Sequence, residues 1–266
     1  MKKRGILFPF ICFLLFASMA TDRPFTLKKS FPIQTTHFTV DKFGNIYTAS
    51  DKLLQKYDSA FHLLYSYSNL NTGKLQSIDA ENPLKLLLFY PDFAKITILD
   101  SRLSVQAEID LRAIQMLQPT AVCNSYNENL WIFDLQDFQL RRINKNLSIN
   151  NESGNLIQIL GYTPHPNFML ESNNWLYVNN PETGILVFDI YGTYYKTIPI
   201  EHIQSFRIFK DQLTYLKNNE IGIYHLKKFT ESKFPIPSGN QDILSAIIGE
   251  KDLYILTKDS VKIYSY

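Results

Sequence analysis

Three side chains in two predicted loops have the types needed for acid–base chemistry or for holding a metal ion. His165 lies in the Pro-containing segment 161–166, and Glu201 is followed directly by His202 in the segment 200–204. An imidazole titrates near neutral pH, so beside a carboxylate it can accept and return a proton. If the two loops meet, these three residues form a catalytic or metal-binding cluster. Loop histidines without such a role are far commoner, so the three are weak candidates.

Three aromatic residues are the candidates for contact with a ligand. Phe93, Tyr162 and Tyr191 stand outside the repeated pattern described below, in segments predicted to be loops. Exposed aromatic side chains supply much of the contact energy where proteins bind partners. These three residues therefore mark a predicted contact surface for a peptide or a carbohydrate.

Acidic residues recur at predicted turns, but the pattern does not favour a metal site. Their positions are Asp51, Asp92, Asp137, Glu182, Glu220 and Asp259. Asp is a common turn residue in its own right, and no turn has the dense Asp-x-Asp-x-Asp-Gly pattern of a calcium loop. The sequence also contains no Gly-x-Ser-x-Gly elbow, no phosphate-binding glycine loop and no Cys–His pair. We expect no metal and no cofactor.

These residues belong to a chain that repeats itself. A turn residue, an aliphatic residue and usually an aromatic residue recur, as in Asn45-Ile46-Tyr47 and Asn129-Leu130-Trp131. The aliphatic position recurs at residues 46, 86, 130, 176, 213 and 253, at intervals of 37 to 46 residues. A period near forty with strand-like units predicts the blades of a β-propeller.

A second phrase follows the first by about ten residues in each unit: an apolar strand that ends at a turn, often with Asp or Asn. Examples are 54–58, ending at Asp58, and 186–189, ending at Asp189. Asp and Asn suit tight turns because their side chains bind nearby backbone amides. With both phrases, each unit divides into four short antiparallel strands. The predicted fold is an all-β, six-bladed propeller.

The two ends of the chain predict how the ring closes. The sixth unit supplies only three strands, 244–248, 251–257 and 261–266, before the chain stops. A spare strand-like segment, 25–33, precedes the first full unit. We expect this N-terminal strand to complete the last blade, because the pairing removes two exposed strand edges.

The repeated hydrophobic phrase, followed by a strand ending in Asp, resembles the NHL-like and related six-bladed propellers of bacterial exported proteins. The resemblance covers residues 21–266 and implies a single propeller domain. Propellers of this kind serve as lyases, esterases, lectin-like binders and docking platforms, so the resemblance implies a fold and no single function.

The first twenty residues predict a signal peptide. Lys2, Lys3 and Arg4 precede an apolar run, and Ser18-Met19-Ala20 places small residues at a cleavage site. The apolar run is too short to span a bilayer, which takes about 20 residues. We therefore expect export to the periplasm or cell surface of a Gram-negative bacterium, with no transmembrane span in the mature chain.

Removal of the leader changes charge and cysteine content. Three of the 27 basic residues lie in it, so the chain from residue 21 has 24 basic and 25 acidic residues. This balance argues against a nucleic-acid partner, which requires clustered positive charge. Cys123 becomes the only thiol, in an apolar context that favours a buried structural role over a nucleophile.

The predicted function is a non-catalytic interaction module in the bacterial envelope, monomeric by itself, that binds a protein or peptide on one propeller face. One alternative is a hydrolase or lyase that uses loops at the channel mouth, with His165, Glu201 and His202 as its candidates. A second alternative is a carbohydrate-binding surface protein. Enzymatic activity is thus left open, and the sequence favours a non-catalytic role.

Overall fold

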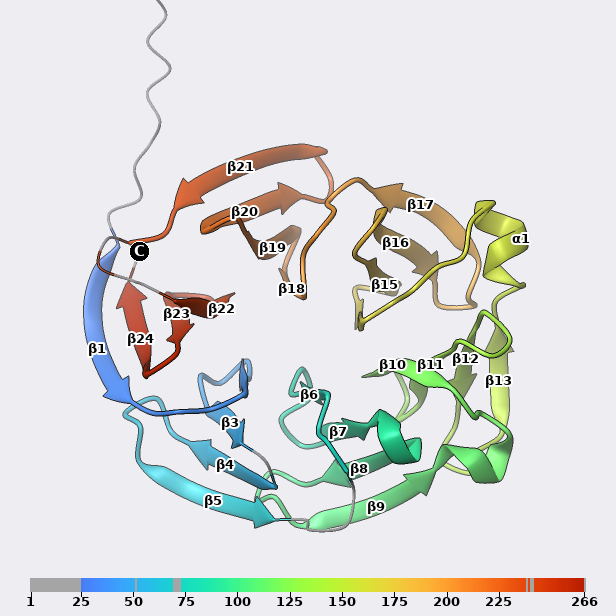
Figure 1. Ribbon diagram of the computed structural model, residues 1–266, viewed down its shortest axis with the longest axis horizontal. Coiled ribbons are helices and arrows are strands. Elements are labelled where there is room, and N and C mark those ends of the chain that lie inside the picture. Colours follow the sequence, from blue (N-terminus) through green and yellow to red (C-terminus); the bar gives the residue numbers. More distant parts are fainter. Residues whose placement is uncertain (1–24, 51, 69–72, 238, 240–241, 266) are drawn as a thin grey trace, which may run out of the picture.

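The computed structural model describes residues 25–50, 52–68, 73–237, 239 and 242–265. Six four-stranded antiparallel sheets stand around a central axis like the blades of a propeller (Figure 1). The predicted fold is confirmed. The segment 1–20, predicted as a signal peptide, lies outside the described residues.

The first five blades follow the chain, each from its innermost strand outward. Blade 1 is β2 (His37–Val40), β3 (Ile46–Ser50), β4 (Leu53–Tyr57) and β5 (Leu63–Ser68). Blade 2 is β6 (Ser77–Asp79), β7 (Leu86–Tyr90), β8 (Lys95–Leu99) and β9 (Val105–Asp110). Blade 3 is β10 (Pro119–Asn124), β11 (Leu130–Asp134), β12 (Gln139–Ile143) and β13 (Ile149–Glu152). Blade 4 is β14 (Phe168–Ser172), β15 (Trp175–Asn180), β16 (Gly184–Asp189) and β17 (Tyr194–Ile198). Blade 5 is β18 (Phe206–Phe209), β19 (Gln212–Lys217), β20 (Glu220–His225) and β21 (Thr230–Pro235).

Blade 6 is built from both ends of the chain. Its strands β22 (Ile243–Ile248), β23 (Asp252–Thr257) and β24 (Ser260–Ser265) are followed outward by β1 (Thr26–Pro32). β1 pairs antiparallel with β24, and Thr26 stands opposite Ser265. The predicted closure of the ring by the N-terminal strand is confirmed.

Buried apolar side chains alternate between two neighbouring blades along each middle strand. In β7, Leu87 and Phe89 pack toward blade 3, whereas Leu86 and Leu88 pack toward blade 1. Successive strand residues point to opposite sides of a sheet, and both sides of a blade are covered by its neighbours. Continuous apolar runs therefore form the middle strands, and each blade interface contains one buried cluster of this kind.

The repeat aromatics lie at these interfaces, as predicted. Tyr47, Trp131, Tyr177 and Tyr254 are all buried. Cys123 is fully buried beside Trp131 in the cluster between blades 3 and 4. Its burial strongly raises the pKa of the thiol, as expected for a structural cysteine that is not a nucleophile.

Antiparallel order divides the loops between the two faces of the ring. Turns that join the first strand of a blade to the second lie on one face, which we call the hairpin face. The connections between blades, and the turns from second to third strand, lie on the other, which we call the connection face. Short helices occur on the connection face: η1 (Pro91–Phe93), η2 (Leu111–Ile114) and α1 (Leu156–Leu160). Within the described residues, no helix has the length and apolar character needed to cross a membrane.

Candidate functional site

A cavity of about 490 Å³ occupies the centre of the ring. All six innermost strands line it, because they are the strands that face the axis. Its walls combine apolar side chains such as Phe38, Phe168 and Phe206 with polar groups such as Gln76 and Asn167. Concave sites with a few converging polar groups in mainly apolar walls are the usual places for ligands. We call it the channel cavity.

Arg207 crosses the channel. It projects from β18 in blade 5 and forms an ion pair with Glu81, which follows β6 in blade 2. It also donates hydrogen bonds to the carbonyl of Val40 and, over 3.3 Å, to Oγ1 of Thr39, both in blade 1. One guanidinium, with its five donors, thus connects three blades where the channel cavity ends.

Asp79, at the end of β6, lies beside this crossing. Its two carboxylate oxygens accept hydrogen bonds from the backbone N–H groups of Asn124, at 2.7 Å, and Glu81, at 2.9 Å. Burial is the main cause that raises the pKa of Asp79, and the charge of Glu81 raises it further. The hydrogen bond from Asn124 and the charge of Arg207 act in the opposite direction. Asp79 is therefore a carboxyl group held closer to its neutral form than an exposed one.

A second pocket, of about 300 Å³, opens on the hairpin face between blades 2, 3 and 4. The turns β6–β7 and β10–β11 and the end of β14 line it. Four lining residues carry carboxylates, Asp79, Glu81, Glu128 and Glu171, against one lining ammonium, that of Lys85. We call it the acidic pocket.

Glu171 fixes one wall of the acidic pocket. Its carboxylate accepts hydrogen bonds from the Ser125 hydroxyl at 2.5 Å, the Tyr126 backbone N–H at 2.9 Å and the Trp131 indole N–H at 2.7 Å. Arg142 donates to the Ser125 hydroxyl and to the Tyr126 carbonyl from the other side. This chain of bonds ties β14 of blade 4 to the β10–β11 turn of blade 3, so the pocket wall is held in one geometry.

Three large apolar side chains are exposed on the hairpin face, one on each of three successive inner turns, those of blades 1, 2 and 3. Phe43, Leu84 and Tyr126 are 69%, 71% and 67% exposed. The turn that carries Phe43 is held by Asp41, whose carboxylate accepts from the N–H groups of Phe43 and Asn45, both at 2.9 Å. We call these three side chains the apolar rim. Their arrangement around a channel mouth makes the hairpin face a candidate interaction surface.

The two loops with candidate catalytic residues attach to the same turn, that between β15 and β16. The backbone N–H of His165 donates to Oδ1 of Asn180 at 2.7 Å, and that of His202 donates to the carbonyl of Pro181 at 2.7 Å. The His202 imidazole lies 3.9 Å from the Glu201 carboxylate, and both side chains are exposed. The connection face thus brings the loops to one turn, and the described residues contain no group of three His, Cys, Asp or Glu arranged to hold a metal.

The candidate aromatic residues are divided between the two faces. Phe93 ends η1 on the connection face, and Tyr162 lies on the same face, where its hydroxyl is 2.9 Å from the Thr183 hydroxyl. Tyr191 is exposed in the turn between β16 and β17, on the side of the hairpin face. The three side chains therefore do not form one continuous surface.

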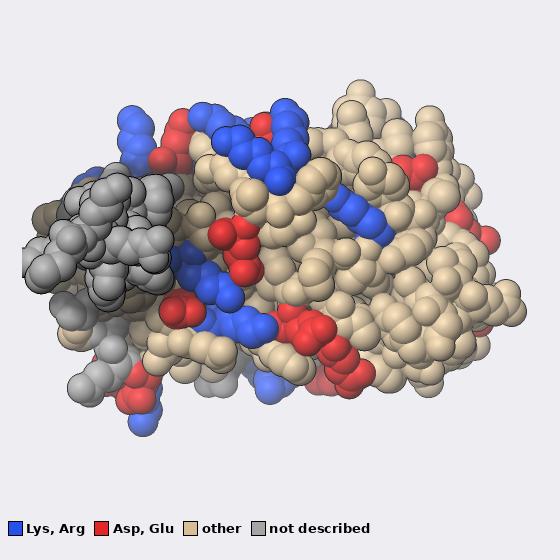
Figure 2. All heavy atoms as spheres, turned by 90° about the horizontal axis from the view of Figure 1, so that it is seen from above, with Lys and Arg blue, Asp and Glu red and all other residues tan. Residues whose placement is uncertain are grey.

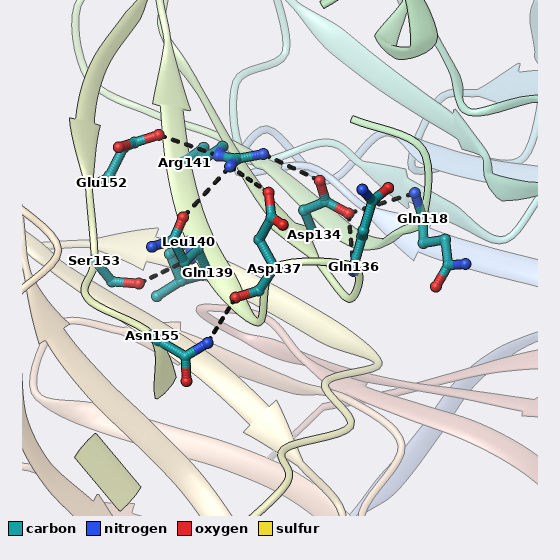
Figure 3. A network of polar contacts seen from close by, with 10 residues as sticks. All are labelled: Gln118, Asp134, Gln136, Asp137, Gln139, Leu140, Arg141, Glu152, Ser153 and Asn155. Carbon is teal, nitrogen blue, oxygen red and sulfur yellow. Dashed lines mark hydrogen bonds and ion pairs between the residues drawn. The ribbon is translucent and has the colours of Figure 1, made fainter. Parts of the chain in front are cut away.

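One of the recurring acidic turn residues, Asp137, belongs to a structural ion-pair network in blade 3 (Figure 3). Arg141 lies between Asp137 at 2.5 Å, Asp134 at 3.1 Å and Glu152 at 3.1 Å. Asp134 is fully buried, so the positive charge of the Arg141 guanidinium offsets the free-energy cost of removing this carboxylate from water. In blade 3, the acidic residue at this turn therefore has a structural role, because Asp137 forms an ion pair with Arg141.

Charges of both signs are interspersed on the edge of the ring shown in Figure 2, with Lys and Arg next to Asp and Glu. Exposed pairs such as Lys227–Asp211, at 2.9 Å, are of this type. The part of this edge formed by the described residues is therefore a surface of mixed charge.

No protein-family model matches the sequence, and no curated protein matches it. Among solved structures, a catalytically inactive variant of virginiamycin B lyase from Staphylococcus aureus with quinupristin is similar, with a TM-score of 0.63 and 14% identity. That similarity covers 90% of this chain and 99% of the other. A streptogramin B lyase has a TM-score of 0.62 and 13% identity over 90% of this chain and 87% of its own. BamB from Moraxella catarrhalis has a TM-score of 0.53 and 9% identity over 91% of this chain and all of its own. At these identities the likeness extends to the propeller fold alone.

Proposed function

We propose that this chain is a non-catalytic, exported propeller that binds a protein or peptide partner through its hairpin face in a bacterial envelope. The observation that carries the proposal is the apolar rim, in which three successive turns of the hairpin face each expose one large apolar side chain, and one of them, Tyr126, also lines the acidic pocket. Large apolar side chains grouped at a rigid surface act as anchors when a partner covers them. The fold also supports such a role, because a ring of blades holds its turns in fixed positions.

Site-specific photo-cross-linking in living cells of the source organism tests this surface. A photoreactive amino acid replaces Leu84 on the hairpin face or Leu117 on the connection face, which is exposed by 53%. We expect a discrete cross-linked species from position 84 that is missing at position 117. The double variant Phe43→Ser/Tyr126→Ser should reduce the yield from position 84 while the protein remains folded by circular dichroism. Equal cross-linking at both positions, or none at either, contradicts the proposal.

Export is tested separately. Cell fractionation should place the protein in the envelope, and the mass of the purified protein should correspond to a chain that begins at Thr21, after removal of residues 1–20. A mass that retains Met1 to Ala20 contradicts the signal-peptide part of the proposal and leaves the binding face untouched.

A second candidate function is lyase or hydrolase activity at the channel. The observation that favours it is Asp79, a carboxyl group with a raised pKa beside the Glu81–Arg207 pair at the end of a 490 Å³ cavity. A carboxyl group with a raised pKa is a candidate proton donor. Incubation of the full chain with quinupristin, followed by mass spectrometry, is the direct test because a similar propeller lyase was solved with that compound. Unchanged quinupristin counts against this activity.

A further inference from the structure

Three aromatic side chains lie together where blades 4 and 5 meet, on the side of the hairpin face. Blade 4 contributes Trp175, at the start of β15, and Tyr195, on β17, and blade 5 contributes Phe229, in the turn between β20 and β21. Tyr195 and Phe229 are each 61% exposed, and Trp175 is half-buried. We call these three residues the aromatic patch. Blades 4 and 5 carry no residue of the apolar rim, so the patch is a separate surface.

Contacts across the two blades hold the aromatic patch together. The ring centroids of Trp175 and Tyr195 are 5.0 Å apart, with an angle of 40° between the rings. The ammonium of Lys196 lies 4.1 Å from the centroid of the Phe229 ring and 5.6 Å from that of the Tyr195 ring. A cation over the face of an aromatic ring is attracted by the negative charge of that face. The rings and the ammonium therefore form one connected surface.

The repeat shows that Trp175 is unusual at its position. It precedes the recurring aliphatic residue, where the other five blades have polar residues: Asn45, Lys85, Asn129, Gln212 and Asp252. One side of Trp175 packs on the buried residues between blades 4 and 5. The indole N–H of the buried Trp131 donates to Glu171 at 2.7 Å, whereas that of Trp175 takes part in no hydrogen bond among the described residues. The blade architecture therefore does not require an aromatic residue here, and its N–H donor is left for a ligand.

Tyr195 is exposed because β17 contains a bulge. Tyr194 pairs with Phe188 and Lys196 pairs with Val187, so Tyr195 is an extra residue without a partner in β16. A bulge re-aims the side chains around it and is common next to functional sites. In β17 it places the side chains of Tyr195 and Lys196 beside the other rings of the patch.

Phe229 is exposed at a position that is buried in another blade. It ends the turn between the third and fourth strands of blade 5, as Leu103 does in blade 2. The two turns have the same conformation at this residue, with φ angles of 57° and 63°. Leu103 is 3% exposed, among the buried residues between blades 1 and 2. The corresponding place between blades 4 and 5 is thus open, and the aromatic patch surrounds it.

Lys196 supplies a positive charge that no acidic residue balances. Within the part of the chain that the structure describes, its ammonium forms no ion pair. Burial lowers the pKa of this ammonium, and no neighbouring carboxylate raises it. An ammonium has three N–H donors, and the faces of aromatic rings leave these donors available to oxygen atoms of a ligand.

The combination of flat rings and N–H donors selects a class of ligand. The negative faces of aromatic rings attract the partially positive hydrogens of C–H groups. A pyranose ring with equatorial substituents presents C–H groups on both faces and oxygen acceptors around its edge. An apolar peptide side chain would cover the rings and leave the donors of Trp175 and Lys196 without acceptors, which is costly once water is excluded. The surface therefore fits a sugar ring better than an apolar side chain.

We propose that the aromatic patch binds a glycan. A pyranose ring stacks on Trp175 and Tyr195, and its hydroxyl or carboxylate oxygens accept hydrogen bonds from Lys196 and from the indole N–H. Phe229 holds the Lys196 ammonium at the edge of the site. This activity goes beyond the proposed docking of a protein on the apolar rim and does not depend on it.

Intrinsic fluorescence of the full chain from residue 21 tests the inference, because Trp175 is the only partly exposed tryptophan. The probes are cellotetraose, which is neutral, and a hyaluronan tetrasaccharide, which carries carboxylates. Sorbitol is the control, since it has hydroxyl groups without ring faces. We expect a saturable change in emission with at least one of the two sugars and none with sorbitol at the same concentration. Tighter binding of the hyaluronan tetrasaccharide would identify a carboxylate as the acceptor for Lys196.

Two variants retain Trp175 as the reporter. Tyr195→Ser should lower the affinity for the bound sugar by about tenfold or more, as the loss of an aromatic anchor does. Lys196→Met keeps an unbranched side chain without the ammonium and should lower the affinity by about fivefold, more for the acidic sugar. Tyr65→Ser is the matched control, an exposed tyrosine on β5 of blade 1 that lies outside the patch. It should not change the affinity, and melting curves of all three variants should overlay that of the wild type.

The inference is overturned if neither sugar gives a saturable response, if sorbitol acts like the sugars, or if Tyr195→Ser binds as tightly as the wild type. A protein cross-linked to a photoreactive residue at position 195, together with failure of both sugars, would make the patch a protein contact instead. Cross-linking at position 84 reports on the apolar rim alone. Its failure contradicts the proposed docking and leaves the glycan site standing.

Discussion

Arg207 of blade 5 forms an ion pair with Glu81 of blade 2 across the centre of the ring. The two residues are 126 positions apart in the chain, and both lie only partly exposed at the channel. The pair joins opposite blades of the ring, and the same guanidinium also donates to Val40 and Thr39 of blade 1. The Arg207–Glu81 ion pair therefore makes the ring more rigid near the hairpin face.

Replacement of Arg207 by leucine should therefore destabilise the whole propeller. The change leaves the Glu81 carboxylate and the Val40 carbonyl without their donor, and a hydrogen bond to a charged group contributes about 1.5–3 kcal/mol. We expect a loss of about 2 kcal/mol in the free energy of unfolding, measured in urea. Glu81→Gln alone and combined with Arg207→Leu completes a double-mutant cycle. If the two effects simply add, the pair contributes nothing across the channel.

The stability of the protein should decrease as the pH rises through the folded-state pKa of Asp79. Burial raises that pKa above its ordinary value of 3.8, so the folded state holds the proton at pH values where the unfolded chain has released it. The contribution is complete at pH below the ordinary value and is lost as the folded carboxyl ionises. Urea unfolding of the wild type and of Asp79→Asn between pH 4 and 8 measures it. The variant should show a flatter profile; parallel profiles would contradict the assignment.

Cys123 should be unreactive in the folded protein. It is fully buried, and burial raises the pKa of its thiol, so the reactive thiolate is scarce and inaccessible. In the chain from residue 21 it is the only cysteine, which makes a disulfide-exchange reagent a direct probe. We expect no reaction over hours without denaturant and one equivalent in urea. Rapid labelling of the native protein would contradict its place between blades 3 and 4.

Deletion of residues 25–33 should open the ring. The deletion removes β1 and exposes the edge of β24 to solvent and to other molecules. We expect a lower melting temperature, with a large part of a typical 5–15 kcal/mol of stability lost, and association into larger species in size-exclusion chromatography. Leu27→Ser is the control, because this side chain is exposed and its replacement keeps the strand. A deletion variant that stays monomeric and melts like the control would show that the closure is dispensable.

Much of the fold could be predicted from the sequence because each blade repeats the same local sequence pattern. The phrase around Ile46 and Tyr47 returns in the other units, and its aromatic position is buried at blade interfaces wherever it recurs. The strand bounds predicted for the sixth unit agree within one residue: the segments 244–248 and 251–257 are β22, Ile243–Ile248, and β23, Asp252–Thr257. The closure was also predictable, since a missing strand at one end matched a spare one at the other.

The candidate site was less predictable because its residues follow no repeat. Arg207 and Glu81 have no partner nearby in sequence, and only the ring brings them together. The apolar rim had a faint signal, in that Phe43 and Tyr126 occupy polar turns where apolar side chains are unusual. His165 and His202 were correctly placed in loops, and the structure shows that the two loops share one turn. Their predicted catalytic role stays a prediction.

The pairing of β1 with β24 also fixes an order of events. Thr26 and Ser265 meet although they are 239 residues apart. β1 can therefore pair only after β24 has been synthesised. Such distant pairing slows folding, since a long loop must close before the contact stabilises it. A chain that is synthesised, or threaded through a membrane, from its N-terminus can assemble five blades on the way. Its ring can close only after the final residues have arrived.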